Sequence, residues 1–79
     1  MLNAQQRTPE PPTAVRGRIE HLFFSGPNFS AGELETDERK SLRFAGKIMV
    51  EIGDEVVLRG SWEKTKYGPQ LKVASFEYA

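Results

Sequence analysis

The sequence predicts an all-β domain built as a small barrel of five short strands. Apolar and polar residues alternate in several short stretches, which is the pattern of half-buried strands. Turn-forming glycine, proline and asparagine residues separate these stretches, and little of the chain favours helix. With 79 residues the chain is long enough for one small domain. Short strands of this kind bury a core most readily as a barrel or a curled sheet.

The first strand is expected to begin at Val15, at the start of a folded domain that covers residues 15–79. Residues 1–14 are polar and rich in proline, and we expect them to form a disordered N-terminal tail. Small or apolar residues alternate with charged ones from Val15 to Glu20. Three apolar residues in a row then break the alternation, and either a bulge near His21 or a stretch covered on both faces would accommodate them.

Two further strands follow in the first half of the chain. A turn at residues 25–28 precedes a strand expected at 29–36, where Gly32 indicates a bulge or a sharp bend. A charged loop over residues 36–41 then leads into a third alternating strand at 42–44.

The longest connection is expected between the third and fourth strands, over residues 46–55. It is predicted to be a short turn or a single helical turn that brings Ile48, Val50 and Ile52 to the core. A turn at Gly53 would end it.

The fourth and fifth strands are expected to form a hairpin over residues 60–73, with Gly68 and Pro69 at its tip. Trp62, the single tryptophan, is expected in the core, because so short a chain needs its large apolar side chains there. A second change of phase near Ala74 would bring the last two aromatic residues into register.

Among five-stranded barrels, the OB-fold fits this pattern best. Glycines occur where the strands must bend, and the longest connection lies between strands three and four, where that fold has its optional helix. An SH3-like barrel is the alternative.

The residues needed for catalysis are scarce. The chain has no cysteine, and its single histidine, His21, follows Glu20 in a predicted strand without the partners of a catalytic or metal site. Gly46 and Lys47 resemble the end of a phosphate-binding loop, but Ile48 stands where that loop needs serine or threonine. We therefore expect a domain that is not an enzyme and has no cofactor, no metal and no small-molecule substrate.

The charge balance excludes a strong overall attraction to polyanions. Eleven basic residues oppose eleven acidic ones, so the formal net charge is zero and any nucleic-acid binding must be local. No apolar run reaches the length of a membrane span, and the N-terminus lacks the apolar core of a signal peptide. We expect a soluble, cytoplasmic protein without a membrane partner.

Local binding of single-stranded nucleic acid is compatible with the predicted fold. OB-folds bind single strands with strands two and three and with the loops that join strands one to two and four to five. Tyr67 lies in the second of these loops beside two lysines, and other basic residues occupy the polar phase of their strands. The outside of any small barrel is also normally charged. The candidate nucleic-acid-binding residues are Arg16, Arg18, Arg43, Arg59, Lys64, Lys66, Tyr67 and Lys72.

Four motifs give the chain a likeness to a known family. They are V-x-G at 15–17, F-A-G at 44–46, I-G-D-E-V-x-L-x-G-x-W at 52–62 and K-Y-G-x-Q-L-K-V-x-S-F-E at 66–77. Together they resemble the N-terminal OB-fold module of RecD-like DNA helicases, the exodeoxyribonuclease V alpha-subunit type. The resemblance spans roughly residues 15–78, nearly the whole predicted domain. It is strongest from Gly53 onward and thin at 24–41, where an acidic hairpin replaces the family's hydrophobic strand pattern.

The resemblance implies a non-catalytic module, a fragment or free-standing relative of an ATP-dependent DNA helicase in DNA repair and recombination. Its expected partners are single-stranded DNA, which it would bind or guide, and the helicase motor domains or a partner subunit. The sequence does not distinguish DNA from RNA as the ligand. An alternative is a docking module that packs on the motor domains without touching DNA, through the apolar candidates Leu22, Phe24 and Val57.

Overall fold

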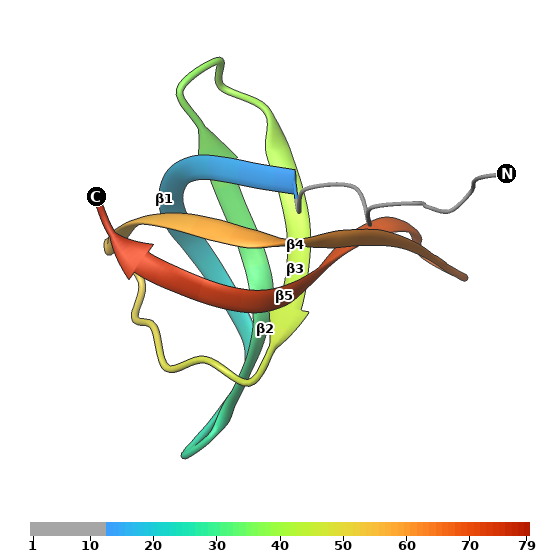
Figure 1. Ribbon diagram of the computed structural model, residues 1–79, viewed down its shortest axis with the longest axis horizontal. Coiled ribbons are helices and arrows are strands. Elements are labelled where there is room, and N and C mark those ends of the chain that lie inside the picture. Colours follow the sequence, from blue (N-terminus) through green and yellow to red (C-terminus); the bar gives the residue numbers. More distant parts are fainter. Residues whose placement is uncertain (1–12) are drawn as a thin grey trace, which may run out of the picture.

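The computed structural model describes residues 13–79, which form an OB-fold-like barrel without helices. The five strands are β1 (Thr13–Gly26), β2 (Phe29–Thr36), β3 (Ser41–Gly46), β4 (Glu55–Thr65) and β5 (Gly68–Tyr78). They close in the order β1-β2-β3-β5-β4, with β3 parallel to β5 and all other neighbours antiparallel. Figure 1 shows the β1–β2 and β4–β5 hairpins extending beyond the barrel in different directions. The predicted all-β fold is confirmed, and no helix of the described chain could span a membrane.

The first strand begins two residues earlier than predicted. Thr13 and Ala14 pair with Gly60 and Arg59 of β4, so the predicted boundary between tail and domain is wrong at these two positions. Ladder hydrogen bonds to β4 compensate for the lack of an apolar pattern at the strand's start. The other residues of the predicted tail, 1–12, lie outside the described part of the chain.

Bulges in β1 bend this 14-residue strand so that it pairs with both β4 and β2. The register against β2 slips twice, at Glu20 and again at Phe23, and each slip leaves one extra residue on β1. The first slip confirms the bulge predicted near His21. Because bulges bend a strand and increase its twist, β1 pairs with β4 along its first half and with β2 along most of its length.

The second predicted change of phase is also present, in the pairing of β4 with β5. The register slips after Arg59 and leaves Ala74 as the extra residue. Next to this bulge the two backbones approach closely at Gly60, which is buried. A Cβ atom at this position would overlap the carbonyl oxygen of Lys72.

Gly60→Ala is therefore expected to destabilise the domain by about 1–3 kcal/mol, because the backbone of β5 must move to admit one methyl group. Urea unfolding followed by far-UV circular dichroism measures the change. Ser61→Ala is the control, since this neighbouring side chain is exposed, and its effect should stay within about 0.5 kcal/mol. Equal midpoints for the two variants would contradict the close approach.

The core combines side chains from all five strands and from the connection between β3 and β4. Its buried members are Ile19, Leu34, Phe44, Ile48, Val50, Val56, Leu58, Leu71 and Val73. One buried polar group is satisfied within it, because the Ser30 hydroxyl donates a hydrogen bond of 2.8 Å to the carbonyl oxygen of Ile48.

The connection between β3 and β4 is irregular and contains a turn but no helix. Ile48 and Val50 are buried as predicted, but Ile52 is 64% exposed, so its predicted place in the core is wrong. The cause lies at the next residue, Gly53, whose amide donates to the carbonyl oxygen of Ile19 at 2.8 Å. This bond and a φ of 96° at Gly53 hold the turn against β1 and leave Ile52 outside.

Trp62 is not in the core, which corrects the prediction from its size. It is 43% exposed. Its register partner is the buried Leu71, and paired residues of an antiparallel ladder point to the same side. The pairing of β4 with β1 ends at Gly60, the partner of Thr13, so Trp62 lies beyond this ladder and part of its ring remains in solvent.

Candidate nucleic-acid interface

Four side chains from three distant parts of the sequence lie together at the surface, Phe23, Arg43, Trp62 and Tyr67, which we call the aromatic cluster. The guanidinium carbon of Arg43 lies 5.0 Å from the ring centre of Phe23 and 5.4 Å from that of Tyr67. Both distances are within the range of cation–π attraction. The exposed fractions are 67% for Tyr67, 56% for Phe23 and 43% for Trp62, so the rings remain open to a ligand.

Local backbone features place two of these rings outside the barrel. Phe23 is the extra residue of the second bulge in β1 and therefore has no partner on β2. Tyr67 lies in the turn between β4 and β5. The hydroxyl of Thr65 accepts a hydrogen bond of 3.0 Å from the Tyr67 amide and donates one of 2.9 Å to the carbonyl oxygen of Gly68. With a φ of 106° at Gly68, these bonds fix the turn.

An open cavity of about 460 Å³ lies between the hairpin and the barrel. The hairpin contributes Trp62, Tyr67 and Pro69 to its walls, and strands β2 and β3 contribute Glu33, Leu42 and Arg43. Aromatic faces, a guanidinium and a carboxylate thus line one space. Such a set can stack a planar base and hydrogen-bond its edge.

Three of the predicted site residues meet at this cluster. Arg43 and Tyr67 belong to it, and the Lys66 ammonium lies 5.3 Å from the Tyr67 ring centre. Lys64 is exposed on the same hairpin. Lys72 is exposed on β5 and pairs with Ala45, two residues beyond Arg43 on β3, so it extends the same outer surface.

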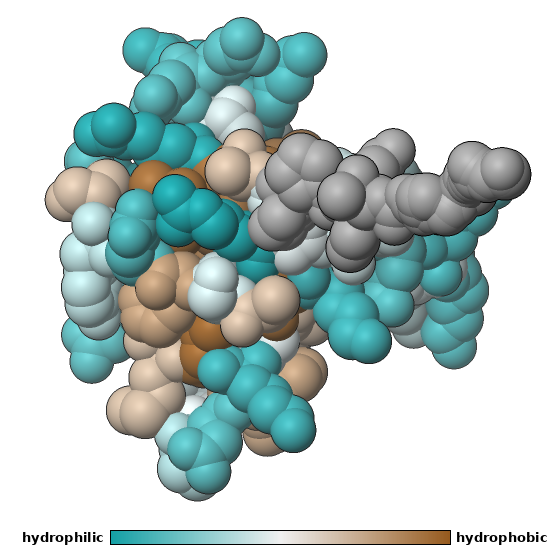
Figure 2. Space-filling view, in the orientation of Figure 1, coloured by the Kyte–Doolittle hydropathy of each residue, from teal (hydrophilic) through white to brown (hydrophobic). Residues whose placement is uncertain are grey.

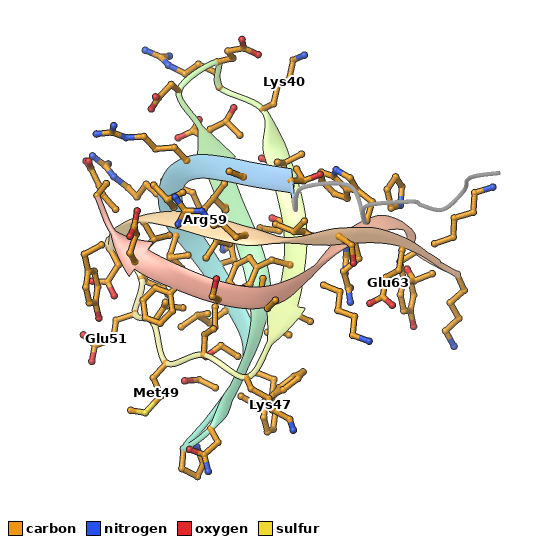
Figure 3. The ribbon with its side chains drawn as sticks, in the orientation of Figure 1. Lys40, Lys47, Met49, Glu51, Arg59 and Glu63 are labelled. Carbon is orange, nitrogen blue, oxygen red and sulfur yellow. The ribbon has the colours of Figure 1, made fainter. Side chains whose placement is uncertain are left out.

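The structure does not bring Arg16, Arg18 and Arg59 to the aromatic cluster. They lie where β1 and β4 pair, and two of them face carboxylates: Arg18 lies 3.4 Å from Glu55, and Arg59 lies 3.3 Å from Glu77. Arg16 and Arg18 line a separate polar cavity that also holds three acidic side chains. Figure 3 shows Arg59 on the barrel and Glu63 out on the hairpin. The positive charges of these arginines are balanced by nearby carboxylates, on a surface separate from the aromatic cluster.

A second pair of exposed rings lies at the tip of the β1–β2 hairpin. The ring centres of Phe24 and Phe29 are 5.9 Å apart, and both rings are at least 40% exposed. Lys47 and Phe29 line a shallow hollow here, and Figure 3 shows Lys47 where β3 ends. This loop is the other one through which OB-folds contact single strands.

Sequence reasoning missed two members of the aromatic cluster, Phe23 and Trp62. Phe23 belongs to the run of three apolar residues that broke the strand pattern, and as the extra residue of a bulge it has no partner on β2. Trp62 follows Gly60 in the hairpin that leaves the barrel. The interrupted alternation at residues 22–24 could therefore have indicated that Phe23 is exposed. The exposure of Trp62 has no such signal in the sequence, because it depends on where β4 stops pairing with β1.

Within residues 13–79, no three histidine, aspartate or glutamate side chains come close enough together to hold a metal ion. No protein-family model matches the sequence, and a search of curated proteins finds no match.

Proposed function

We propose that this domain is a non-catalytic module that binds single-stranded DNA along the outer surface of β3 and the β4–β5 hairpin. The observation that supports this proposal is the contact of Arg43 with Phe23 and Tyr67, beside the exposed Trp62. Exposed rings stack on bases, and neighbouring cations attract phosphates. Proteins that bind single strands without strong sequence preference combine these two features.

A narrower proposal concerns the parent protein. The motifs from V-x-G at 15–17 to K-Y-G-x-Q-L-K-V at 66–73 favour a RecD-like, ATP-dependent DNA helicase of the cytoplasm. In such an enzyme this domain would guide the strand toward or away from the motor domains, to which it would be attached or docked. The ATP-binding residues would lie in those domains.

The charges predict weak binding that depends strongly on salt. The formal net charge is zero, so attraction to DNA comes from a few local cations near the cluster, among them Lys64, Lys66 and Lys72. Each phosphate that these lysines neutralise releases counterions, and added salt opposes this release.

Titration with a thymidine oligonucleotide at low salt tests the proposal. Trp62 is the only tryptophan, so a base that stacks in the cavity should change the intrinsic fluorescence. The same titration with a uridine oligonucleotide of equal length compares the affinity for RNA with the affinity for DNA. Amide NMR shifts of the β4–β5 hairpin that stay unchanged up to millimolar oligonucleotide would refute the proposal.

Removal of one hairpin cation should reduce the salt dependence. Lys66→Ala is expected to flatten the slope of log affinity against log salt by about 0.7, the value for one phosphate contact on a single strand. Lys40→Ala is the matched control, because this lysine lies in the β2–β3 loop, where its ammonium is 3.9 Å from Glu38 (Figure 3). Equal slopes of log affinity against log salt for the two variants would mean that Lys66 does not contact a phosphate.

A second candidate function is protein docking on the motor domains or a partner subunit. Met49, Ile52 and Tyr78 are each more than 60% exposed, and two of them line a hollow of about 320 Å³. Figure 2 shows apolar side chains, in brown and beige, gathered over this part of the surface, below β5. Of the docking residues expected from sequence, Phe24 is 57% exposed, whereas Leu22 and Val57 are partly buried.

The docking function has its own test. Association with separately expressed motor domains that survives high salt, and that Ile52→Asp abolishes, would favour it. Loss of the same association in Tyr67→Ala would instead assign the contact to the aromatic cluster.

A further inference from the structure

The cavity beside the aromatic cluster contains a carboxylate, which is unusual on a surface for a polyanion. Glu33 lines this cavity together with Arg43, Trp62 and Tyr67. A carboxylate here repels phosphates, so phosphate binding alone does not account for it. Its position at the edge of a stacking site indicates a contact with a base.

The carboxylate of Glu33 is available for such a contact. Glu33 is directly opposite Arg43 in the pairing of β2 with β3. Arg43 nevertheless contacts the rings of Phe23 and Tyr67, and none of the ion pairs within residues 13–79 involves Glu33. The side-chain hydrogen bonds of the same residues do not involve it either. Among the described residues its oxygens therefore remain free to accept hydrogen bonds from a ligand.

The chemistry of an ionised carboxylate selects among the bases. It only accepts hydrogen bonds, and it is best satisfied by two donors side by side. Guanine is the one common base whose Watson–Crick edge offers two adjacent donors, N1–H and the 2-amino group. Cytosine and adenine pair one amino group with an acceptor nitrogen, and the N3–H of thymine lies between two carbonyl oxygens.

The guanidinium in the same cavity complements the other side of guanine. Arginine donates to guanine O6 and N7 more often than to any other base atoms. Arg43 is held near the rings by its cation–π contacts, so a base that stacks on Trp62 or Tyr67 lies close to both Arg43 and Glu33. The guanidinium of Arg43 and the carboxylate of Glu33 together thus match the hydrogen-bonding groups of guanine.

We propose that this cavity is a guanine-selective subsite, in which Glu33 accepts from the N1–H and 2-amino groups while Arg43 donates to O6 or N7. The inference rests on the proposed function, because the base is delivered by a single strand bound along the hairpin. It adds a preference for strands that carry an unpaired guanine.

The test compares thymidine oligonucleotides of about twelve residues, a length within the range of one OB-fold site, that differ at one central base. Guanine is expected to bind about tenfold more tightly than thymine, since a good bidentate contact contributes discrimination of this order. Hypoxanthine, which lacks the 2-amino group, should lose most of this gain. Adenine, which stacks as a purine but presents an acceptor at N1, should behave like thymine.

Two substitutions in β2 test whether the preference for guanine depends on Glu33. Glu33→Gln should reduce the guanine preference to about threefold or less, because a neutral amide is a weaker acceptor, and should tighten binding of the all-thymine strand by removing a negative charge. Glu35→Gln is the matched control: it removes the same charge from β2, but Glu35 lines the separate polar cavity with Arg16 and Arg18. This variant should retain the full preference.

The outcomes separate this inference from the proposed function. Equal binding of the guanine, hypoxanthine and thymine strands to the wild-type domain would refute the subsite while leaving single-strand binding intact. A preference unchanged in Glu33→Gln would refute the role of Glu33. If no oligonucleotide binds, both proposals fail. The comparison of guanine with hypoxanthine uses the wild-type protein and so decides the question even if a variant does not fold.

Discussion

Tyr67→Ala is expected to weaken the binding of a thymidine oligonucleotide by about tenfold, within a range of roughly five- to 150-fold. The basis is that stacking of one base on an aromatic ring contributes about 1–3 kcal/mol. Tyr67 is 67% exposed and lies in a turn, so its loss should leave the barrel folded. Fluorescence anisotropy of a labelled oligonucleotide at low salt measures the change.

The chain contains a matched control for this substitution. Tyr78 is 64% exposed, close to the value for Tyr67, but it lies near the end of β5 beside Phe76, away from the hairpin tip. Tyr78→Ala should leave oligonucleotide affinity unchanged within about twofold, because surface substitutions away from a site have small effects. If the two tyrosine variants lose the same affinity, the aromatic cluster is not the binding site.

Phe44→Ala is expected to lower the free energy of unfolding by about 3–5 kcal/mol, the usual cost of removing a buried ring. Phe44 is 1% exposed and is the largest fully buried side chain of the described chain. Domains have about 0.05–0.15 kcal/mol of stability per residue, which is about 4–12 kcal/mol for a 79-residue chain, so this loss is between about a quarter and all of the stability. Urea unfolding, or an NMR spectrum without dispersed amide signals, would show it.

Phe24→Ala serves as the comparison, because it removes the same ring from a position that is 57% exposed. Its effect on stability should stay within about 0.5 kcal/mol. A cooperative unfolding transition for Phe44→Ala at nearly the wild-type urea concentration would mean that the barrel does not pack around this ring.

Much of the fold could be predicted because the relevant signals are local. The strand at 29–36 was placed correctly from two turns and a weak alternation, and the structure gives Phe29–Thr36. The extra residues near His21 and Ala74 were visible as breaks of a period of two, since each shifts every later side chain to the opposite face. The start of β1 was missed because Thr13 and Ala14 belong to the sheet through pairing with β4, not through an apolar pattern.

The candidate site was predicted less completely. Arg43, Lys66 and Tyr67 were identified from their residue types, and the structure brings them together. Residue type alone could not separate them from Arg18 and Arg59, whose guanidinium groups face the carboxylates of Glu55 and Glu77. An arginine in the polar phase of a strand looks the same in sequence whether its neighbour across the sheet is a ring or a carboxylate.

The sequence by itself predicted five strands, most of their turns and two of the three bulges, because alternation, glycine and proline act through the backbone of neighbouring residues. The predicted tip of the last hairpin is wrong, because the turn lies at Lys66 and Tyr67, while Gly68 and Pro69 already pair with β4. Tertiary structure alone decided which rings remain outside. Trp62 has a large ring of the kind that usually packs in a core, yet it is 43% exposed because the ladder between β1 and β4 ends before it and Phe44 already fills the interior. The aromatic cluster exists only after β1, β3 and the β4–β5 hairpin meet, since contacts between residues far apart in the chain depend on how the barrel closes.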